Sequence, residues 1–385
     1  MSCAAAEYQQ SQRFVVENQV KRIVILLHRY LGLLAALFAL LLGLSGSLLA
    51  VQQLLQGETY PAPVASHAAS PHYQVVLASL RASYPQADFT LRLPQNPADA
   101  IEVRVRQRQQ PDQLLWLDPQ FGRPLATPEG RGTGWRWLHE VHARLLLEDG
   151  KTWVGVAGIA ILLVLLSGII HWWPKDWRKA WRLRRDKGLA VWLGDLHRML
   201  GASMLLLLLL STLSGLVLAF NQPIRQWLSP AKHGQPRTGK HITPAGPQLA
   251  LDELVARGNA RLPQGRLSSI SISARANQPV ELRKRLDDEL HPNGSTLIRL
   301  DPYRGTVLSV ERTEQTQAWR KIGSWAQALH TGSLGGVWHQ LLMVVSGVVL
   351  MILGGSGLFQ WQARRRKQGS RQAAMVATRA RTAQQ

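Results

Sequence analysis

The chain has 385 residues, and 45 lysines and arginines against 24 aspartates and glutamates give it a formal net charge of +21. These basic residues gather in short stretches beside long apolar runs, and none of the stretches is large enough for a folded nucleic-acid-binding domain. We therefore expect no nucleic-acid partner. The single cysteine, Cys3, excludes an intrachain disulfide, a Cys-x-x-Cys-His haem attachment and a thiolate-ligated iron–sulfur cluster.

Four apolar runs are long enough to cross the ~30 Å hydrocarbon core of a bilayer as helices. We predict an α-helical integral membrane protein with four transmembrane helices in two repeats. Its segments are the N-terminus 1–22, span 23–51, outer region 52–152, span 153–173, basic loop 174–189, span 190–222, outer region 223–335, span 336–361 and basic tail 362–385. Short segments rich in Lys and Arg stay cytoplasmic, so both termini are expected inside, and tryptophans at the span ends are expected to contact membrane lipid.

Each outer region is predicted to form a small α+β module. The expected elements are helices at 75–84 and 249–262 and strands at 89–93, 101–105 and 269–272. Both regions then contain Asp-Pro-x-x-Gly, beginning at Asp118 and at Asp301, which is typical of a turn that ends a strand. The shared order of these patterns indicates an internal duplication.

Four histidines stand next to the predicted spans. His28 and His197 each follow leucine and precede arginine where the first and third spans begin, and His142 and His330 precede the second and fourth spans. Histidine inside a membrane is energetically expensive and usually functional. A duplicated histidine indicates a pair of ligands that face each other.

Each span also contains a Ser-Gly pair, whose glycines are Gly46, Gly168, Gly215 and Gly357. In the first and third spans the serine follows the histidine by 17 residues, which cover ~25 Å of helix. Gly46 and Gly215 are therefore expected at the level of His142 and His330. Gly168 and Gly357 are expected at the level of the other two histidines.

This arrangement favours two b-type haems, each held by two histidines. One haem is predicted between His28 and His197, and the other between His142 and His330. The glycines are expected to allow close backbone approach to the edges of the flat macrocycle. Two alternatives remain, which are simple helix packing by the Ser-Gly pairs and a zinc site, although no cysteine or carboxylate lies at helical spacing to complete a tetrahedral set.

Two arginines and three further histidines lie near the predicted haem sites in the sequence. Arg29 and Arg198 follow the histidines of one pair, where they either bind haem propionates or anchor the spans at the cytoplasmic face. The alternative iron ligands are His171, His339 and His139. The histidines expected to be solvated in the outer regions are His67, His72, His233, His241 and His291.

These motifs resemble those of the PepSY-associated transmembrane proteins, and in particular those of FoxB-like ferrisiderophore reductases. The resemblance covers residues 20–365 and rests on the two Leu-His-Arg motifs, the histidines before the second and fourth spans, the Ser-Gly-x-x-x-Trp ends of those spans and the paired Asp-Pro-x-x-Gly turns. It implies PepSY-like periplasmic modules, bound haem and a place in the bacterial inner membrane. It also implies reduction of a ferric siderophore, with the hydroxamate type as one candidate.

The expected function is a transmembrane electron conduit that reduces iron in the siderophore and so releases it. No dinucleotide, P-loop or flavin signature is present in the sequence, so electrons are expected from an external donor, either quinol or a cytoplasmic reductase. The alternative functions are a siderophore or iron permease and a non-catalytic regulatory or interaction protein. A permease favours broken helices and a polar midplane, whereas the predicted third span is rich in leucine.

Overall fold

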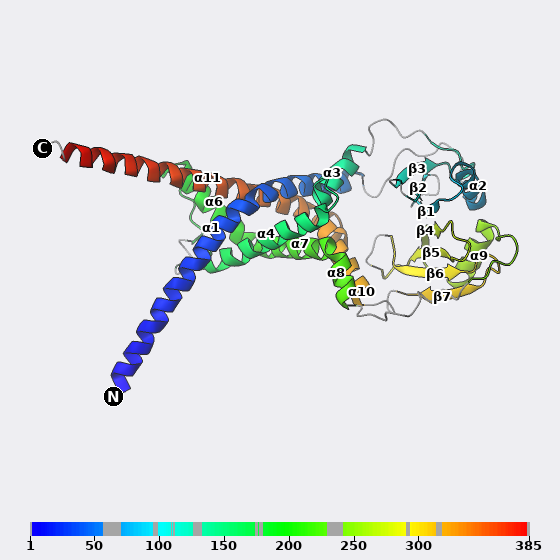
Figure 1. Ribbon diagram of the computed structural model, residues 1–385, viewed down its shortest axis with the longest axis horizontal. Coiled ribbons are helices and arrows are strands. Elements are labelled where there is room, and N and C mark those ends of the chain that lie inside the picture. The colour runs from blue at the N-terminus through cyan, green and yellow to red at the C-terminus, as the bar shows by residue number, and fades with distance from the viewer. Residues whose placement is uncertain are drawn as a thin grey trace. The chain divides into compact units, whose positions relative to one another are not determined.

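The computed structural model describes residues 2–56, 71–94, 99–108, 110, 112–125, 133–173, 176, 180–228, 242–289, 293–312 and 318–382. The chain divides into a helical unit, formed by Met1–Val51, Leu138–Phe220 and Leu329–Gln385, and a sheet unit, formed by Gln52–Trp137 and Asn221–Ala328 (Figure 1). His67, His233, His241 and His291, which we expected in outer loops, lie outside the described residues.

The helical unit contains the apolar helices that the sequence predicts as spans. They are α1 (Ser2–Gln56), α4 (Gly150–Trp172), α6 (Leu189–Ser203), α7 (Leu205–Ala219) and α11 (Gly336–Thr382). Within the described residues, three helices are long and apolar enough to cross a membrane, and α6 with α7 makes a fourth if the pair is one span. Both α1 and α11 extend beyond the predicted spans, so the polar segments that flank those spans are also helical.

The predicted third span, 190–222, is interrupted. Helices α6 and α7 meet at Met204 and are bent by 67° relative to each other. Gly201 lies just before the break, and the hydroxyl of Ser203 donates a hydrogen bond to the carbonyl of Leu200 at 3.3 Å. Glycine–serine combinations and serine bonds back to the preceding turn both bend helices. The expectation of one unbroken helix was therefore wrong.

Small residues allow α1 and α11 to approach closely. A Cβ added at Gly43 would lie 2.6 Å from the carbonyl oxygen of Gly347, so the two backbones are in contact here. Ser47 on α1 donates a hydrogen bond to the carbonyl of Val344 at 3.0 Å. Contacts of this kind are how membrane helices associate without a hydrophobic driving force. A buried apolar cluster joins four of the helices and consists of Ala35, Ile161, Leu165, Leu208 and Val349.

The sheet unit is built on one antiparallel sheet of seven strands in the order β3-β2-β1-β4-β5-β6-β7. The strands are β1 (Asp88–Arg92), β2 (Ile101–Arg106), β3 (Gln113–Leu117), β4 (Arg266–Ile272), β5 (Val280–Arg285), β6 (Thr296–Leu300) and β7 (Val307–Glu311). β1 and β4 pair directly, with Phe89 opposite Ile272 and Leu91 opposite Ile270. The two outer regions therefore share one sheet instead of forming separate modules, because each would otherwise leave an apolar strand edge unpaired.

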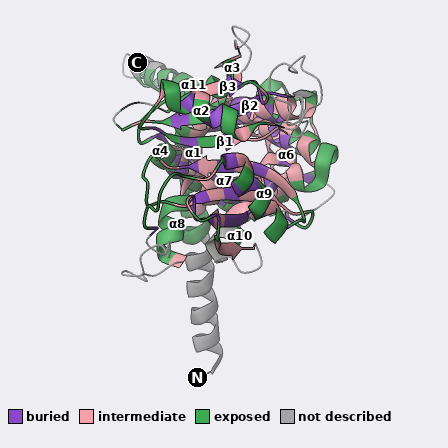
Figure 2. Cartoon of the chain, turned by 90° about the vertical axis from the view of Figure 1, so that its right-hand side faces the viewer, coloured by how far each residue is buried: buried purple, intermediate pink, exposed green. Residues whose placement is uncertain are grey.

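Two helices cover one face of this sheet. They are α2 (Tyr73–Ser83) and α9 (Leu251–Arg261), whose buried leucines pack against alternate residues of the strands. Figure 2 shows buried segments on these strands and on α9. The predicted helices and strands are confirmed, although β4 begins earlier than predicted, at Arg266. A further short helix, α8 (Asn221–Leu228), follows α7.

The two predicted turns are also confirmed, and they have the same local structure. The carboxylate of Asp118 accepts hydrogen bonds from the backbone N–H groups of residues 120 and 121, and that of Asp301 accepts them from residues 303 and 304. Gly122 and Gly305 then take φ angles of +63° and +66°, which favour glycine.

Candidate functional site

The helical unit brings together the predicted partners His142 and His330. His142 lies on α3 (Thr133–Arg144) and His330 on α10 (Ala318–Thr331), and their ring centroids are 6.0 Å apart with an interplanar angle of 41°. The Nδ1 atom of His142 lies 2.9 Å from the hydroxyl of Ser45, and that of His330 lies 3.3 Å from the hydroxyl of Ser214. Two helices thus provide imidazoles, and α1 and α7 provide the hydroxyls that contact them.

Both histidines of this pair are half-buried, and the loss of contact with water favours the uncharged ring. Burial, together with the neighbouring His330 and His139, lowers the pKa of His142 to about 3. Burial also lowers the pKa of His330. Both rings are therefore neutral at physiological pH, and a neutral imidazole has the free lone pair that a metal ligand needs.

The other predicted pair, His28 and His197, has a similar geometry. His28 lies on α1 and His197 on α6, and their ring centroids are 6.4 Å apart with an interplanar angle of 89°. The Nδ1 atom of His28 lies 3.1 Å from the hydroxyl of Ser167, and that of His197 lies 2.8 Å from the hydroxyl of Ser356. The sequence analysis did not assign a role to these four serines, although the repeated Ser-Gly pairs were the signal that could have found them.

The separation within each pair suits two ligands on opposite sides of one metal ion. An imidazole nitrogen binds a metal at ~2 Å and its ring centre lies about 1 Å further away, so two such ligands place their centroids ~6 Å apart. The observed distances are 6.0 and 6.4 Å. No group of three His, Cys, Asp or Glu residues that could hold a metal ion exists within the described part of the chain. The geometry therefore fits a cofactor that provides its own equatorial ligands better than it fits zinc.

The four glycines lie at the predicted levels, but they face imidazoles. A Cβ added at Gly46 or Gly215 would lie 3.0 Å from Cε1 of His142 or His330, respectively. The corresponding distance to His28 is 3.3 Å at Gly168, and that to His197 is 3.9 Å at Gly357. The glycines were expected at the macrocycle edge, whereas the structure places them where they make room for the histidine rings.

A buried carboxylate, which the sequence analysis missed, holds one of the predicted arginines. Asp195 on α6 is 2% exposed, and it accepts hydrogen bonds from Nη2 of Arg198 at 2.9 Å and from the backbone N–H and guanidinium of Arg184 at 2.9 to 3.0 Å. An acidic residue inside an apolar run, two positions before His197, was the available signal. The Nε atoms of Arg29 and Arg198 are buried and have no hydrogen-bond partner among the described residues. Two unused donors beside the His28–His197 pair suit an anionic ligand group.

The alternative ligands lie in different surroundings. His139 is exposed on α3, and His339 is half-buried in the first turn of α11. His171 is on α4, but its side chain lies outside the described part of the structure. His72 precedes the first turn of α2 in the sheet unit, and its backbone accepts hydrogen bonds from that turn.

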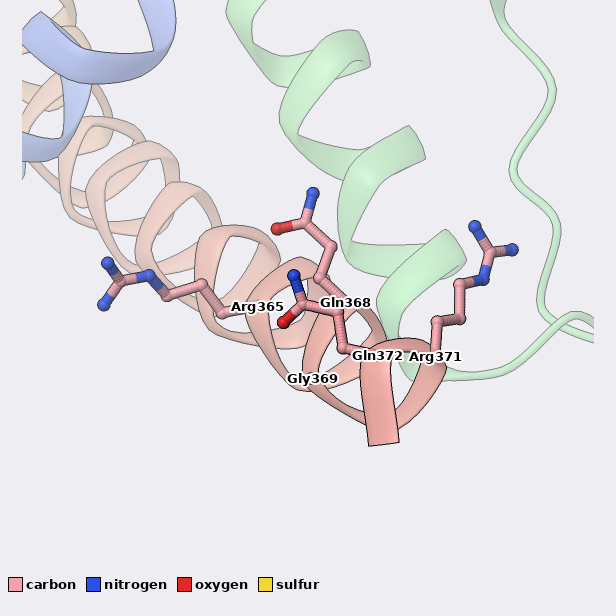
Figure 3. Close-up of a pocket in the computed structure, with 5 residues that line it drawn as sticks. All are labelled: Arg365, Gln368, Gly369, Arg371 and Gln372. Atoms are coloured by element: carbon pink, nitrogen blue, oxygen red, sulfur yellow. The ribbon is translucent and has the colours of Figure 1, made fainter. Parts of the chain in front are cut away.

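A surface hollow on the C-terminal part of α11 is unrelated to the histidines (Figure 3). It is lined by Arg365, Gln368, Gly369, Arg371 and Gln372. These side chains suit contact with solvent or anionic groups and include no residue of either histidine pair. We therefore place the candidate site at the two histidine pairs.

Comparison with known proteins agrees with the resemblance seen in the motifs. An uncharacterised protein of Pseudomonas aeruginosa is 27% identical over 256 residues, which cover 59% of this chain and 63% of that protein. The chain thus matches somewhat less than two thirds of the length of this relative. The family described as PepSY-associated TM region matches residues 25–364, which contain both histidine pairs and all the candidate spans. Because the match covers nearly the whole chain, the protein belongs to the family of PepSY-associated TM regions.

Proposed function

We propose that this protein is a di-haem b reductase of the bacterial inner membrane that passes electrons across the membrane to a ferric siderophore. The observation that carries the proposal is the presence of two half-buried histidine pairs whose ring centroids are 6.0 and 6.4 Å apart. Pairs with this spacing would suit a haem iron held between two imidazoles, and two such pairs within one helical unit would suit a path for electrons.

In this proposal His28 and His197 hold one haem, and His142 and His330 hold the other. The haem iron supplies one-electron redox chemistry. Arg29 and Arg198 offer their unpartnered Nε donors to propionates beside the first pair, and Asp195 keeps the Arg198 guanidinium in place. Ser45, Ser167, Ser214 and Ser356 orient the four imidazoles.

The proposed direction of electron flow follows from charge and chain topology. The short basic segments at the N-terminus, in the loop 174–189 and in the tail 362–385 favour cytoplasmic termini, and the sheet unit is then periplasmic. A quinol or a cytoplasmic reductase then supplies electrons at the His28–His197 pair, and the ferric siderophore accepts them on the periplasmic side. Oxygen donors of the hydroxamate type hold hard Fe(III) more strongly than softer Fe(II), so the transfer of one electron to the iron weakens the chelate and releases the metal.

A permease shares one feature with this chain, which is the helix break at Met204. Permeases use such breaks to expose backbone groups around a polar site at the membrane midplane. Here the described residues that pack near the break are apolar, and they include Leu200, Leu205 and Leu208. The break therefore gives little support to a substrate site in the membrane.

An optical spectrum tests the proposal directly. Protein purified from haem-replete cells is expected to be red, with a Soret band, sharp α and β bands after reduction, and two haems per chain by pyridine haemochrome and iron analysis. This result is expected because each histidine pair would hold one haem iron. A colourless preparation, or a preparation that contains zinc without iron, would contradict the proposal.

The glycine contacts provide a second, finer prediction. Gly215→Ala is expected to lower the haem-to-protein absorbance ratio, because the new methyl group would lie 3.0 Å from Cε1 of His330 and must displace that ring. Gly357→Ala is the matched control, since its methyl group would lie at an ordinary 3.9 Å from Cε1 of His197. Equal haem loss in both variants would show that the ring contact is not what limits haem binding.

A further inference from the structure

Each of the four paired histidines contacts a serine whose hydroxyl also lies within hydrogen-bond distance of a carbonyl in its own helix. The serine hydroxyls donate to carbonyls one turn earlier in their own helices. The bonds run from Ser45 to Leu41 at 2.7 Å, from Ser167 to Val164 at 3.0 Å, from Ser214 to Leu210 at 2.8 Å and from Ser356 to Leu353 at 3.2 Å. A hydroxyl has one proton to donate but two lone pairs that accept. When that proton is donated to the carbonyl, each serine oxygen acts as an acceptor towards the histidine.

Backbone carbonyls lead to the same result independently at two of the histidines. Nδ1 of His28 lies 3.1 Å from the carbonyl oxygen of Val164, and Nδ1 of His330 lies 3.1 Å from that of Ser211. A carbonyl oxygen has no proton, so the hydrogen in both bonds must belong to Nδ1. At His28 and His330 the serine and the carbonyl thus both require a proton on Nδ1.

We infer that the four serines are positioning residues that fix each paired histidine in its Nδ1–H tautomer, in which Nε2 carries the lone pair. The tautomer follows from hydrogen bonding alone, whereas the consequence for iron rests on the proposed function. A ligating histidine that donates its second N–H to a fixed acceptor has a defined orientation and a more basic ligand nitrogen. Repetition at Ser45, Ser167, Ser214 and Ser356 gives both pairs the same support.

Helix α11 offers a matched pair of variants for the test. Ser356 and Ser346 are both buried and both donate to the carbonyl three residues earlier, Ser346 to Met343 at 2.8 Å. They are ten residues apart, about 15 Å along the helix. A role limited to helix packing predicts equal effects of Ser356→Ala and Ser346→Ala, whereas a role in positioning predicts an effect of Ser356→Ala alone.

The first measurement does not depend on haem. In the full-length, haem-depleted protein labelled with ¹⁵N-histidine, Nδ1 of His197 is expected to have the chemical shift of a protonated nitrogen. Ser356→Ala is expected to increase the population protonated at Nε2, and Ser356→Thr, which retains the hydroxyl, is expected to restore the original tautomer. A wild-type His197 protonated at Nε2 would overturn the inference, whatever the protein does with haem.

The second measurement uses the haem-loaded protein. Ser356→Ala is expected to weaken haem retention at the His28–His197 pair about tenfold, as loss of a hydrogen-bond partner behind a ligating histidine typically does. It is also expected to raise the midpoint potential of that haem alone, because a less basic ligand stabilises Fe(III) less. Ser346→Ala should change neither quantity. Equal changes in both variants would overturn the positioning role while leaving the di-haem proposal intact. A protein without any haem would overturn the di-haem proposal, while the tautomer measurement would still test the positioning role.

Discussion

Replacement of His197 by alanine is expected to reduce the haem content from two per chain to one. The haem that remains should be the one held by His142 and His330, because that pair lies on α3 and α10 and shares no ligand with the first. The measurement is the pyridine haemochrome content together with a redox titration, which should change from two steps to one. His142→Ala should remove the other step in the same way.

His139→Ala is the matched control for this experiment, because it removes an imidazole from the same helix as His142 but from an exposed position. It should retain both haems. Should His139→Ala or His339→Ala instead remove a full haem equivalent, the assignment of ligands at the His142–His330 pair would be wrong. The helical architecture would be unaffected by that result.

A ferric siderophore is expected to reoxidise the dithionite-reduced protein and to yield Fe(II) that a ferrous chelator can trap. In sealed vesicles of defined orientation, the reaction should proceed only when the siderophore is on the side of the sheet unit. This side is expected because the ends of α1 and α11, which are proposed to lie in the cytoplasm, are single helices, whereas the sheet unit has a folded core.

The gallium complex of the same siderophore is the control, since Ga(III) has the size and charge of Fe(III) but accepts no electron under these conditions. It should leave the reduced spectrum unchanged. Reoxidation from the cytoplasmic side alone would reverse the proposed direction. The sheet unit would then serve a different partner.

The pairing of the histidines could be predicted from the sequence because helix geometry is regular. A fixed rise per residue converts the spacing between His28 and the Ser45-Gly46 pair into a depth, and the second half repeats this spacing from His197. The depth of a residue in the membrane does not determine which atom of a neighbouring helix contacts the imidazole ring. The glycines were therefore placed at the correct level, whereas their contacts with the imidazoles could not be predicted.

The features that could not be predicted depend on contacts between distant parts of the chain. The pairing of β1 with β4 joins segments that each have a complete local pattern, so neither pattern reveals the partner strand. The bend at Met204 lies in a run of leucines, where hydropathy is uniform and only Gly201 and Ser203 indicate a weak point. Asp195 is the exception, because it could have been noticed as a charge in an apolar run whose arginine partners lie only 11 and 3 residues away.

The ladder between β1 and β4 also determines how the chain must be threaded through a membrane. Strands can pair only on the same side of a bilayer, so the segment from β1 to β4 must cross it an even number of times. If the candidate span α4 is one crossing, we expect the bent pair α6–α7 to complete the second as a single span instead of turning back as a re-entrant loop. A chain inserted with the wrong number of crossings would leave the edges of β1 and β4 on opposite sides, each unpaired and prone to aggregation. We therefore expect the β1–β4 pairing to form only in chains whose helices have been inserted into the membrane with an even number of crossings between these two strands.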